Sequence, residues 1–300
     1  MKGINKKKKR KKGMVVCLFM AIFIIVIIIV FALGCNNTLK IQRYIVKNHK
    51  IKAPIKIALV TDLHSCKYGE KEKELISAIE SQKPDLILLG GDIYDDVQPD
   101  DNSDCLVEWI GSKSDEVPSY YVTGNHEYWR KDVDLVIKKI KEHGIKVLDG
   151  QSDTIAINGQ NINVCGLSDP DYFAAGEGYL DKNAASLYGT EIQLEKIGES
   201  VKKESFTVLL AHRPEFIKKY LEYEFDLILS GHAHGGQWRI PGLINGLIAP
   251  GQGLFPDYAG GEYSFDSGSK MIVSRGLARE TTRIPRIFNQ PELVMVEITP

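Results

Sequence analysis

Five of the seven histidines follow apolar runs of strand length, in short loops that also carry acidic or amide side chains. The candidate chemical residues in these loops are Asp62, His64, Asp92, Asn125, His126, His212, His232 and His234. Asp62 and His64 are two residues apart, as are His232 and His234, so each pair can face one point where the chain bends past its strand. Carboxylates and imidazoles together suit Zn, Mn or Fe, whereas Ca²⁺ prefers oxygen ligands. The pattern therefore predicts a site for a borderline divalent cation.

The number of these side chains indicates two cations. Apart from His126, two carboxylates, one amide and four imidazoles exceed the ligands that a single ion needs. If two ions share one carboxylate, the set fits a pair about 3.5–4 Å apart. In an open α/β sheet, polar groups at the carboxyl ends of the strands converge on one edge, where ligands bind. We therefore expect these distant segments to meet at the edge of a sheet.

From Pro54 onward, strand-like and helical patterns alternate along the chain. Short apolar runs between turn residues predict buried strands at 55–60, 85–89, 119–122, 206–211 and 226–229. Apolar residues at helical spacing predict helices at 70–82, 104–112, 132–143, 192–202 and 214–220. Asn158-Gly159 predicts a hairpin turn, and later strands are expected at 270–274 and 293–298. The layout predicts an α/β fold, a four-layer αββα sandwich of two sheets.

The candidate residues form five blocks in a fixed order. These are Asp62-x-His64, Gly91-Asp92-x-x-Asp95, Gly124-Asn125-His126-Glu127, His212 and Gly231-His232-x-His234. The series resembles the signature of calcineurin-like metallophosphoesterases, and the resemblance covers residues 54–299. The stretch GHAHGGQW at 231–238 and the stretch RIFNQPE at 286–292 look most like a membrane-associated bacterial branch of that family. Ala278 departs from the pattern, because related sequences often have Gly there.

The resemblance implies a metallophosphatase-like fold and a role for each site residue. The implied ligands are Asp62, His64 and His234 for one cation, Asn125, His212 and His232 for the other, and Asp92 as a bridge between them. His126 would contact the phosphoester and protonate the leaving oxygen. A metal-bound hydroxide would attack phosphorus in line, since binding to metal lowers the pKa of water towards ~7. Asp95 suits either metal contact or a turn, and Glu127 is expected to orient a neighbouring group.

The N-terminal region predicts a membrane anchor. Residues 1–12 carry eight Lys or Arg and no acid, and residues 13–34 are uncharged and rich in Ile, Val and Phe. A helix of that length spans about 33 Å, enough for a hydrocarbon core of about 30 Å. The positive-inside rule then gives a basic cytoplasmic tail, a single-pass transmembrane helix at 13–34 and an extracytoplasmic catalytic domain at the cell membrane. A cleaved signal peptide and lipidation at Cys35 are the alternatives.

Residues 35–53 are polar and basic, and they predict a connector with one strand around 43–46, followed by the metallophosphoesterase domain at 54–300. Without the eight basic residues of the tail, 30 basic residues face 39 acidic ones. A nucleic-acid-binding domain usually carries a basic excess, so nucleic acid is not an expected partner. The five cysteines have no CxxC spacing, which argues against a disulfide framework or a zinc knuckle.

The sequence thus predicts a membrane-anchored two-metal hydrolase of a phosphorylated substrate, cleaving a phosphodiester, phosphomonoester or pyrophosphate bond. The anchor suits a lipid-linked substrate, although a tether also serves an enzyme with a soluble substrate. The alternatives are a nuclease or cyclic-nucleotide phosphodiesterase, and a non-catalytic, metal-stabilised scaffolding protein. The acidic domain argues against polynucleotides, and the presence of His126 beside a complete ligand set argues against a scaffolding protein. His49 and His143 are expected to be surface or structural residues.

Overall fold

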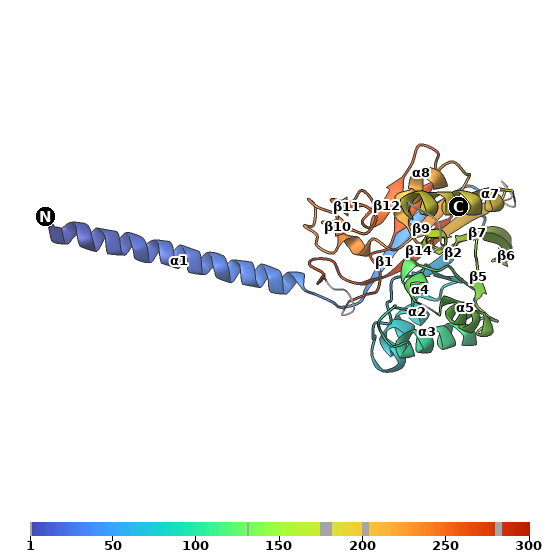
Figure 1. Ribbon diagram of the computed structural model, residues 1–300, viewed down its shortest axis with the longest axis horizontal. Coiled ribbons are helices and arrows are strands. Elements are labelled where there is room, and N and C mark those ends of the chain that lie inside the picture. The colour runs from blue at the N-terminus through green and yellow to red at the C-terminus, as the bar shows by residue number, and fades with distance from the viewer. Residues whose placement is uncertain (1, 131, 175–181, 200–203, 280–283) are drawn as a thin grey trace.

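Two six-stranded sheets form the centre of the molecule in the computed structural model (Figure 1). The structure describes residues 2–130, 132–174, 182–199, 204–279 and 284–300. The first sheet contains, in spatial order, β1 (Lys40–Lys47), β14 (Glu292–Thr299), β2 (Ile55–Val60), β3 (Leu86–Leu89), β4 (Ser119–Tyr121) and β5 (Lys146–Val147). Strands β2 to β5 pair in parallel, β14 is antiparallel to β2, and β1 is parallel to β14.

The second sheet has a parallel centre and two antiparallel edge strands. It contains, in spatial order, β12 (Gly261–Ser264), β13 (Lys270–Val273), β9 (Leu227–Ser230), β8 (Phe206–Ala211), β7 (Gln160–Leu167) and β6 (Gln151–Ile157). Strands β13, β9, β8 and β7 are parallel, while β12 and β6 pair antiparallel to their neighbours. A separate two-stranded ribbon joins β10 (Ile248–Ala249) to β11 (Gly253–Leu254). The loops at the carboxyl ends of the parallel strands supply the candidate site.

Helices cover the outer face of each sheet. The outer face of the first sheet is covered by α2 (Lys73–Gln82), α3 (Asp101–Ser112) and α5 (Val133–Glu142), and that of the second by α7 (Lys182–Gly198) and α8 (Ile217–Tyr220). Alternate strand residues face opposite sides. Leu86 and Leu88 therefore pack between the sheets, and Ile87 and Leu89 pack beneath the helices. The expected αββα sandwich of four layers is confirmed.

The helices bury the apolar stripes that their sequences indicate. In α2, Leu75 and Ile79 are four residues apart and both are fully buried, and Val136 and Ile140 have the same relation in α5. A spacing of four places two side chains on one face of a helix. Three short helices lie within the loops that follow the strands. They are α4 (Asn125–Trp129), α6 (Asp171–Ala174) and the 3-10 turn η3 (His234–Gly236). The sequence did not predict them, because elements of three to five residues leave no periodic signal.

Two predicted segments differ from the structure by more than a few residues. The expected helix at 192–202 corresponds to α7, which begins ten residues earlier, and residues 200–202 lie outside the described residues. The segment 35–53, expected to be a connector with a strand around 43–46, contains the eight-residue strand β1, which extends the first sheet. Hydrogen bonding to β14 therefore brings the folded unit forward to about residue 40.

A single long helix, α1 (Lys2–Gly34), projects from the domain (Figure 1). Among the described residues, its segment Gly13–Gly34 is the one stretch long and apolar enough to cross a membrane, with a mean hydropathy of 3.6, and its most apolar 18 residues are all unburied. Exposed apolar surface of this length suits a hydrocarbon environment rather than water. Length and composition thus favour membrane association for this end of the chain.

Candidate metal centre

The loops that follow five parallel strands converge where the edges of the two sheets meet. Asp62 and His64 follow β2, Asp92 follows β3, and Asn125 and His126 begin α4 after β4. From the second sheet, His212 follows β8, and His232 and His234 follow β9. The two sheets are joined here by the ring of His212, whose Nδ1 donates to the Gly90 carbonyl over 2.7 Å. All the residues that the sequence singled out therefore lie in one region.

Five of the predicted ligands have left-handed backbone conformations. Their φ angles are 53° at Asp62, 49° at His64, 51° at Asp92, 63° at His232 and 46° at His234. This conformation costs an L-amino acid about 1–2 kcal/mol, and it persists where the surrounding structure enforces it. The sharp bend after each strand turns residues two apart in the sequence towards the same point.

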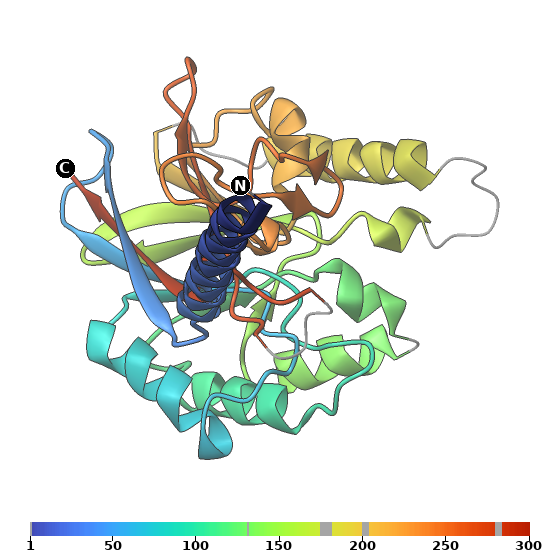
Figure 2. The same cartoon turned by 90° about the vertical axis from the view of Figure 1, so that its left-hand side faces the viewer.

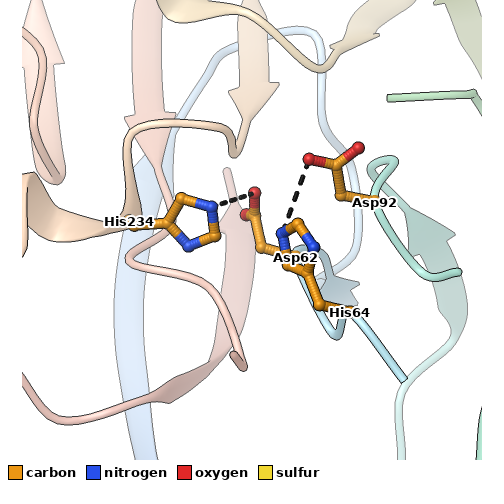
Figure 3. A group of neighbouring side chains, drawn as sticks. All are labelled: Asp62, His64, Asp92 and His234. Atoms are coloured by element: carbon orange, nitrogen blue, oxygen red, sulfur yellow. Dashed lines mark ion pairs between the residues drawn. The ribbon is translucent and has the colours of Figure 1, made fainter. Parts of the chain in front are cut away.

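The first group of converging side chains consists of Asp62, His64, Asp92 and His234 (Figure 3). One donor atom from each lies within 4.8 Å of those from the others. His64 Nε2 is 3.5 Å from Asp92 Oδ2, and His234 Nε2 is 3.8 Å from Asp62 Oδ1. All four residues are buried. This group offers two carboxylates and two imidazoles to one point.

A second group shares Asp92 with the first. The donor atoms of Asp92, His212 and His232 also lie within 4.8 Å of one another. His212 Nε2 is 3.1 Å from Asp92 Oδ2, although the two are not aligned as a hydrogen bond. Asn125 is buried at the start of α4, and the neighbouring N–H of His126 donates to Asp92 Oδ1 over 2.8 Å. The carboxylate of Asp92 thus stands between the two groups.

Six buried polar atoms of these residues have no hydrogen-bond partner. They are His64 Nε2, Asp92 Oδ2, Asn125 Oδ1, His212 Nε2, His232 Nε2 and His234 Nδ1. A buried polar atom left unsatisfied costs about 1–3 kcal/mol, and native proteins contain few of them. Imidazole nitrogens and carboxylate or amide oxygens are ligands for borderline divalent cations. The residues present therefore fit a metal site.

Hydrogen bonds to the second ring nitrogen orient two of the histidines. His212 donates from Nδ1 to Gly90, and His64 Nδ1 lies 3.0 Å from Asp95 Oδ2. Such partners fix the ring of a metal-binding histidine and leave Nε2 to face the cation. Asp95 also accepts the backbone N–H groups of Val97 and Gln98 through Oδ1, each over 2.9 Å. Asp95 therefore both forms a turn and holds His64.

Two glycines allow the loops to approach Asp62 and Asp92. A Cβ atom at Gly124 would lie 2.2 Å from Asp92 Oδ1, and one at Gly231 would lie 2.4 Å from Asp62 Oδ2. No side chain fits at such distances without displacing the carboxylate. The glycines in the blocks GNHE and GHAH are thus required by the packing of the site.

Glu127 is a buried carboxylate that fastens two of the loops together. Its Oε2 accepts the N–H groups of Asp92 and Gly124 over 2.9 and 2.8 Å. Its Oε1 accepts those of Ile93 and Tyr94 over 2.8 and 3.1 Å. Glu127 therefore orients the backbone around Asp92, in agreement with the orienting role expected for it.

We expect Glu127→Gln to lower the free energy of unfolding by about 2–6 kcal/mol, because two of the four buried N–H groups would face an amide NH₂ instead of an oxygen. Urea denaturation followed by circular dichroism measures this change. The exposed Glu116→Gln, which removes the same charge, should shift the free energy by less than about 0.5 kcal/mol. Equal effects of the two substitutions would contradict the structural role of Glu127.

The pKa values of the site histidines are shifted in opposite directions, depending on whether the nearby charge of Asp92 or burial dominates. Burial would raise the pKa of Asp92, but the nearby charge of His212 holds it well below its ordinary value. Burial would lower the pKa of His212, but Asp92 raises it to about 10. Burial holds the pKa of His232 and His234 well below the ordinary histidine value. The last two rings are therefore neutral at pH 7, the form that binds metal.

His126 lies at the wall of an open cavity beside these groups. The cavity has a volume of about 490 Å³, and its lining includes His64, His126, His234 and Trp129. His126 Nδ1 is 2.7 Å from Asp96 Oδ1, and 22% of its side chain is exposed. Burial lowers the pKa of His126, but Asp95, Asp92 and Asp96 raise it to about 9. A protonated imidazole is therefore available next to the candidate metal ligands.

Two polar residues of the site were missed in the sequence. Asp96 contacts His126, and Glu215 Oε1 lies 3.7 Å from His232 Nε2. The acidic pair after β3 was the available signal for Asp96, whereas Glu215 lies within a short helical turn and shows no pattern. Of the remaining histidines, His49 is exposed and His143 ends α5, in agreement with the expected non-catalytic placement.

The chain is similar in sequence to several proteins that are named metallophosphoesterases. An uncharacterized metallophosphoesterase of Campylobacter jejuni is 29% identical over 272 residues, which cover 88% of this chain and 65% of that protein. An uncharacterized metallophosphoesterase of Aquifex aeolicus is 25% identical, with 87% of this chain and 92% of that one covered. A transmembrane protein with a metallophosphoesterase domain from Bos taurus is 28% identical over 61% of this chain and 41% of its own length.

The chain spans slightly less than two thirds of the Campylobacter protein and under half of the bovine one. The profile of the calcineurin-like phosphoesterase family matches residues 55–236, from β2 through the loop that carries His232 and His234. This match covers more than half of the sequence and contains every residue of the candidate metal centre. The chain therefore belongs to the calcineurin-like phosphoesterase family, and it is a metal-dependent phosphoester hydrolase.

Proposed function

We propose that the chain is a two-metal hydrolase that cleaves a phosphodiester, phosphomonoester or pyrophosphate bond. The observation that most directly supports two metal ions is the position of Asp92, whose carboxylate belongs to both groups of converging donor atoms. The proposed ligands are Asp62, His64 and His234 for one cation, Asn125, His212 and His232 for the other, and Asp92 for both. The mixed oxygen and nitrogen donors suit Mn, Fe or Zn.

Bound cations of this kind lower the pKa of water towards ~7 and neutralise charge that develops on phosphoryl oxygens. The protein residues position the ester and supply the proton for the leaving oxygen. His126 faces the cavity that the substrate enters, and Asp95 and Asp96 keep its ring charged. A charged imidazole can donate a proton to the leaving oxygen, which contributes a factor of about 10²–10⁴ in such reactions.

We further propose that residues 13–34 span the cell membrane, with residues 1–12 in the cytoplasm and the catalytic domain on the outer side. The supporting observations are the exposed apolar helix and the basic block before it. A lipid-linked phosphoester is the substrate class that this placement favours. A nuclease or cyclic-nucleotide phosphodiesterase remains the alternative enzyme, and the acidic charge of the domain argues against a polynucleotide substrate.

The test of this function is turnover of an activated diester and monoester, bis(4-nitrophenyl) phosphate and 4-nitrophenyl phosphate, by the full chain in detergent. We expect hydrolysis of at least one ester in the presence of Mn²⁺ and loss of that rate after treatment with a chelator. Adding back Mn²⁺, Fe²⁺ or Zn²⁺ should restore the rate and rank the cations. A zero rate with both esters and every cation would support the non-catalytic, metal-stabilised alternative instead.

A further inference from the structure

Exposed apolar side chains gather on the loops that follow the metal-binding loop of β9. We call this set the apolar face, and it consists of Trp238, Ile240, Leu243, Leu254 and Phe255 on these loops, with Ile284 from the segment between β13 and β14. Leu243 is 78% exposed, Leu254 66% and Phe255 63%. Residues 237–256 contain a single charged residue, Arg239. Large exposed apolar patches mark surfaces that contact another molecule or a membrane.

The backbone holds these side chains outward. Residues Ile240 and Ile244 close a tight turn, with hydrogen bonds of 3.0 Å from Ile240 N and 2.8 Å from Ile244 N, and Leu243 lies at its tip. Phe255 N donates to Leu247 O over 2.8 Å, and Leu247 N donates to Gly236 O over 2.9 Å. The exposed loops are therefore braced against η3, which carries His234.

The apolar face adjoins the point where α1 leaves the domain. Gly34, the last residue of α1, is buried, and its carbonyl accepts the N–H of Phe288 over 2.7 Å. The segment that contains Phe288 also contacts Trp238. The indole of Trp238 donates to Pro285 O over 2.9 Å, and an isolated β-bridge pairs Trp238 with Ile287. Figure 1 shows β10 and β11 on the side of the domain from which α1 projects, and Figure 2, viewed along α1, shows this region beside the helix.

We infer that the apolar face is seated in the lipid bilayer that α1 crosses, at the boundary between head groups and acyl chains. This inference rests on the proposed span at residues 13–34. A span that ends at Gly34 puts the membrane surface at the contact between Gly34 and Phe288, and the apolar face projects towards the same surface. Tryptophan is enriched at that boundary, and apolar side chains there are buried to a depth of about 5–10 Å.

The low charge of the apolar face is compatible with insertion into a lipid bilayer. No carboxylate lies within residues 237–256, and the first acid after them is Asp257, so the apolar side chains of the face bring no negative charge of their own segment against anionic lipid head groups. A protein partner with an apolar surface is the competing occupant. The connection of the face to the end of α1 favours the bilayer, because the membrane is already held at that position.

The seated face would place the mouth of the catalytic cavity against the bilayer. Pro250 and Ile284 line the cavity together with His64, His126 and His234. Ile284 thus belongs both to the cavity and to the apolar face. A phosphoester head group that belongs to a membrane lipid would reach these histidines from the membrane plane.

The test uses the full chain in vesicles of phosphatidylcholine and phosphatidylglycerol, with and without bromine on the acyl chains. Bromine quenches indole emission only at close range. Leu243→Trp places an indole at the tip of the face, and Leu135→Trp places one at a site of similar exposure, 63%, on α5, away from α1 (Figure 1). We expect the emission added by Leu243→Trp to fall by a factor of about two or more in brominated vesicles. That added by Leu135→Trp should not change.

Equal quenching of the two added indoles would overturn the inference and point to a protein partner for the face. A second variant, Leu243→Glu with Leu254→Glu, should reduce the quenching of the native emission, because Trp238 would withdraw from the bilayer. Its rate on bis(4-nitrophenyl) phosphate should stay within about twofold of the wild type, which shows that it is folded. If the wild type itself did not hydrolyse bis(4-nitrophenyl) phosphate, the proposed hydrolase activity would be contradicted. The quenching result would still decide whether the apolar face contacts the membrane.

Discussion

Asp92→Asn should remove both the bound metal and the hydrolytic activity. The substituted side chain keeps one oxygen, which can still accept the N–H of His126, so the loop is expected to retain its conformation. The oxygen lost is Oδ2, which faces both His64 and His212 over 3.5 and 3.1 Å. An NH₂ group at that position cannot bind a cation, and it removes the charge that two cations would share. We expect metal content to fall to background and kcat/KM to drop by about 10³-fold or more.

Metal content by inductively coupled plasma mass spectrometry and turnover of a nitrophenyl ester measure the two effects together. The matched control is Asp101→Asn, which changes the same side chain at an exposed position in the first turn of α3. It should leave both quantities within about twofold. If Asp92→Asn kept full metal content and full activity, the shared role of Asp92 would be wrong.

His126→Asn should lower kcat while the metal content stays unchanged. The ring of His126 faces the cavity and hydrogen-bonds to Asp96, but it belongs to neither group that contains Asp92. A proton donor matters most when the leaving oxygen is strongly basic. We therefore expect a loss of about 10²–10⁴-fold with an alkyl leaving group and a much smaller loss with 4-nitrophenolate, which leaves without help.

The comparison of the two leaving groups separates proton donation from simple positioning of the ester. A positioning role would lower both rates by the same factor. The control is His49→Asn, at an exposed histidine in the turn after β1, which should leave both rates unchanged. Loss of metal from His126→Asn would show instead that His126 is a ligand.

Much of the fold was predictable because the strands and helices of the domain carry strong periodic signals. The runs at 55–60 and 206–211 match β2 and β8 residue for residue, since each is a mostly apolar stretch bounded by turn residues. The strand β1 was predicted only in part. It is an edge strand with polar residues on its solvent side, and its pairing with the C-terminal strand β14 involves partners about 250 positions apart. Single-segment patterns carry no information on such a pairing.

The site was predictable at the level of which residues meet. Strand ends followed by Asp, Asn and His in short loops indicate one convergent edge, and the structure brings all of them there. Geometry beyond that was not predictable. The left-handed conformation of Asp62 and Asp92 depends on hydrogen bonds between loops, such as Asp62 N to Gly91 O over 3.0 Å. Glu215 reaches His232 only because η2 (Pro214–Phe216) folds back towards β9.

The pairing of β1 with β14 has a mechanical consequence for a tethered domain. β1 follows α1 after five residues, and its eight residues lie parallel to β14 in register from Lys40–Glu292 to Lys47–Thr299. Drag on the domain would pull β1 along its own axis, across hydrogen bonds that run between the strands. The load would then be distributed over the whole ladder at once, in shear, rather than opening it one bond at a time. The tether should therefore withstand larger forces than one attached to the tip of a hairpin.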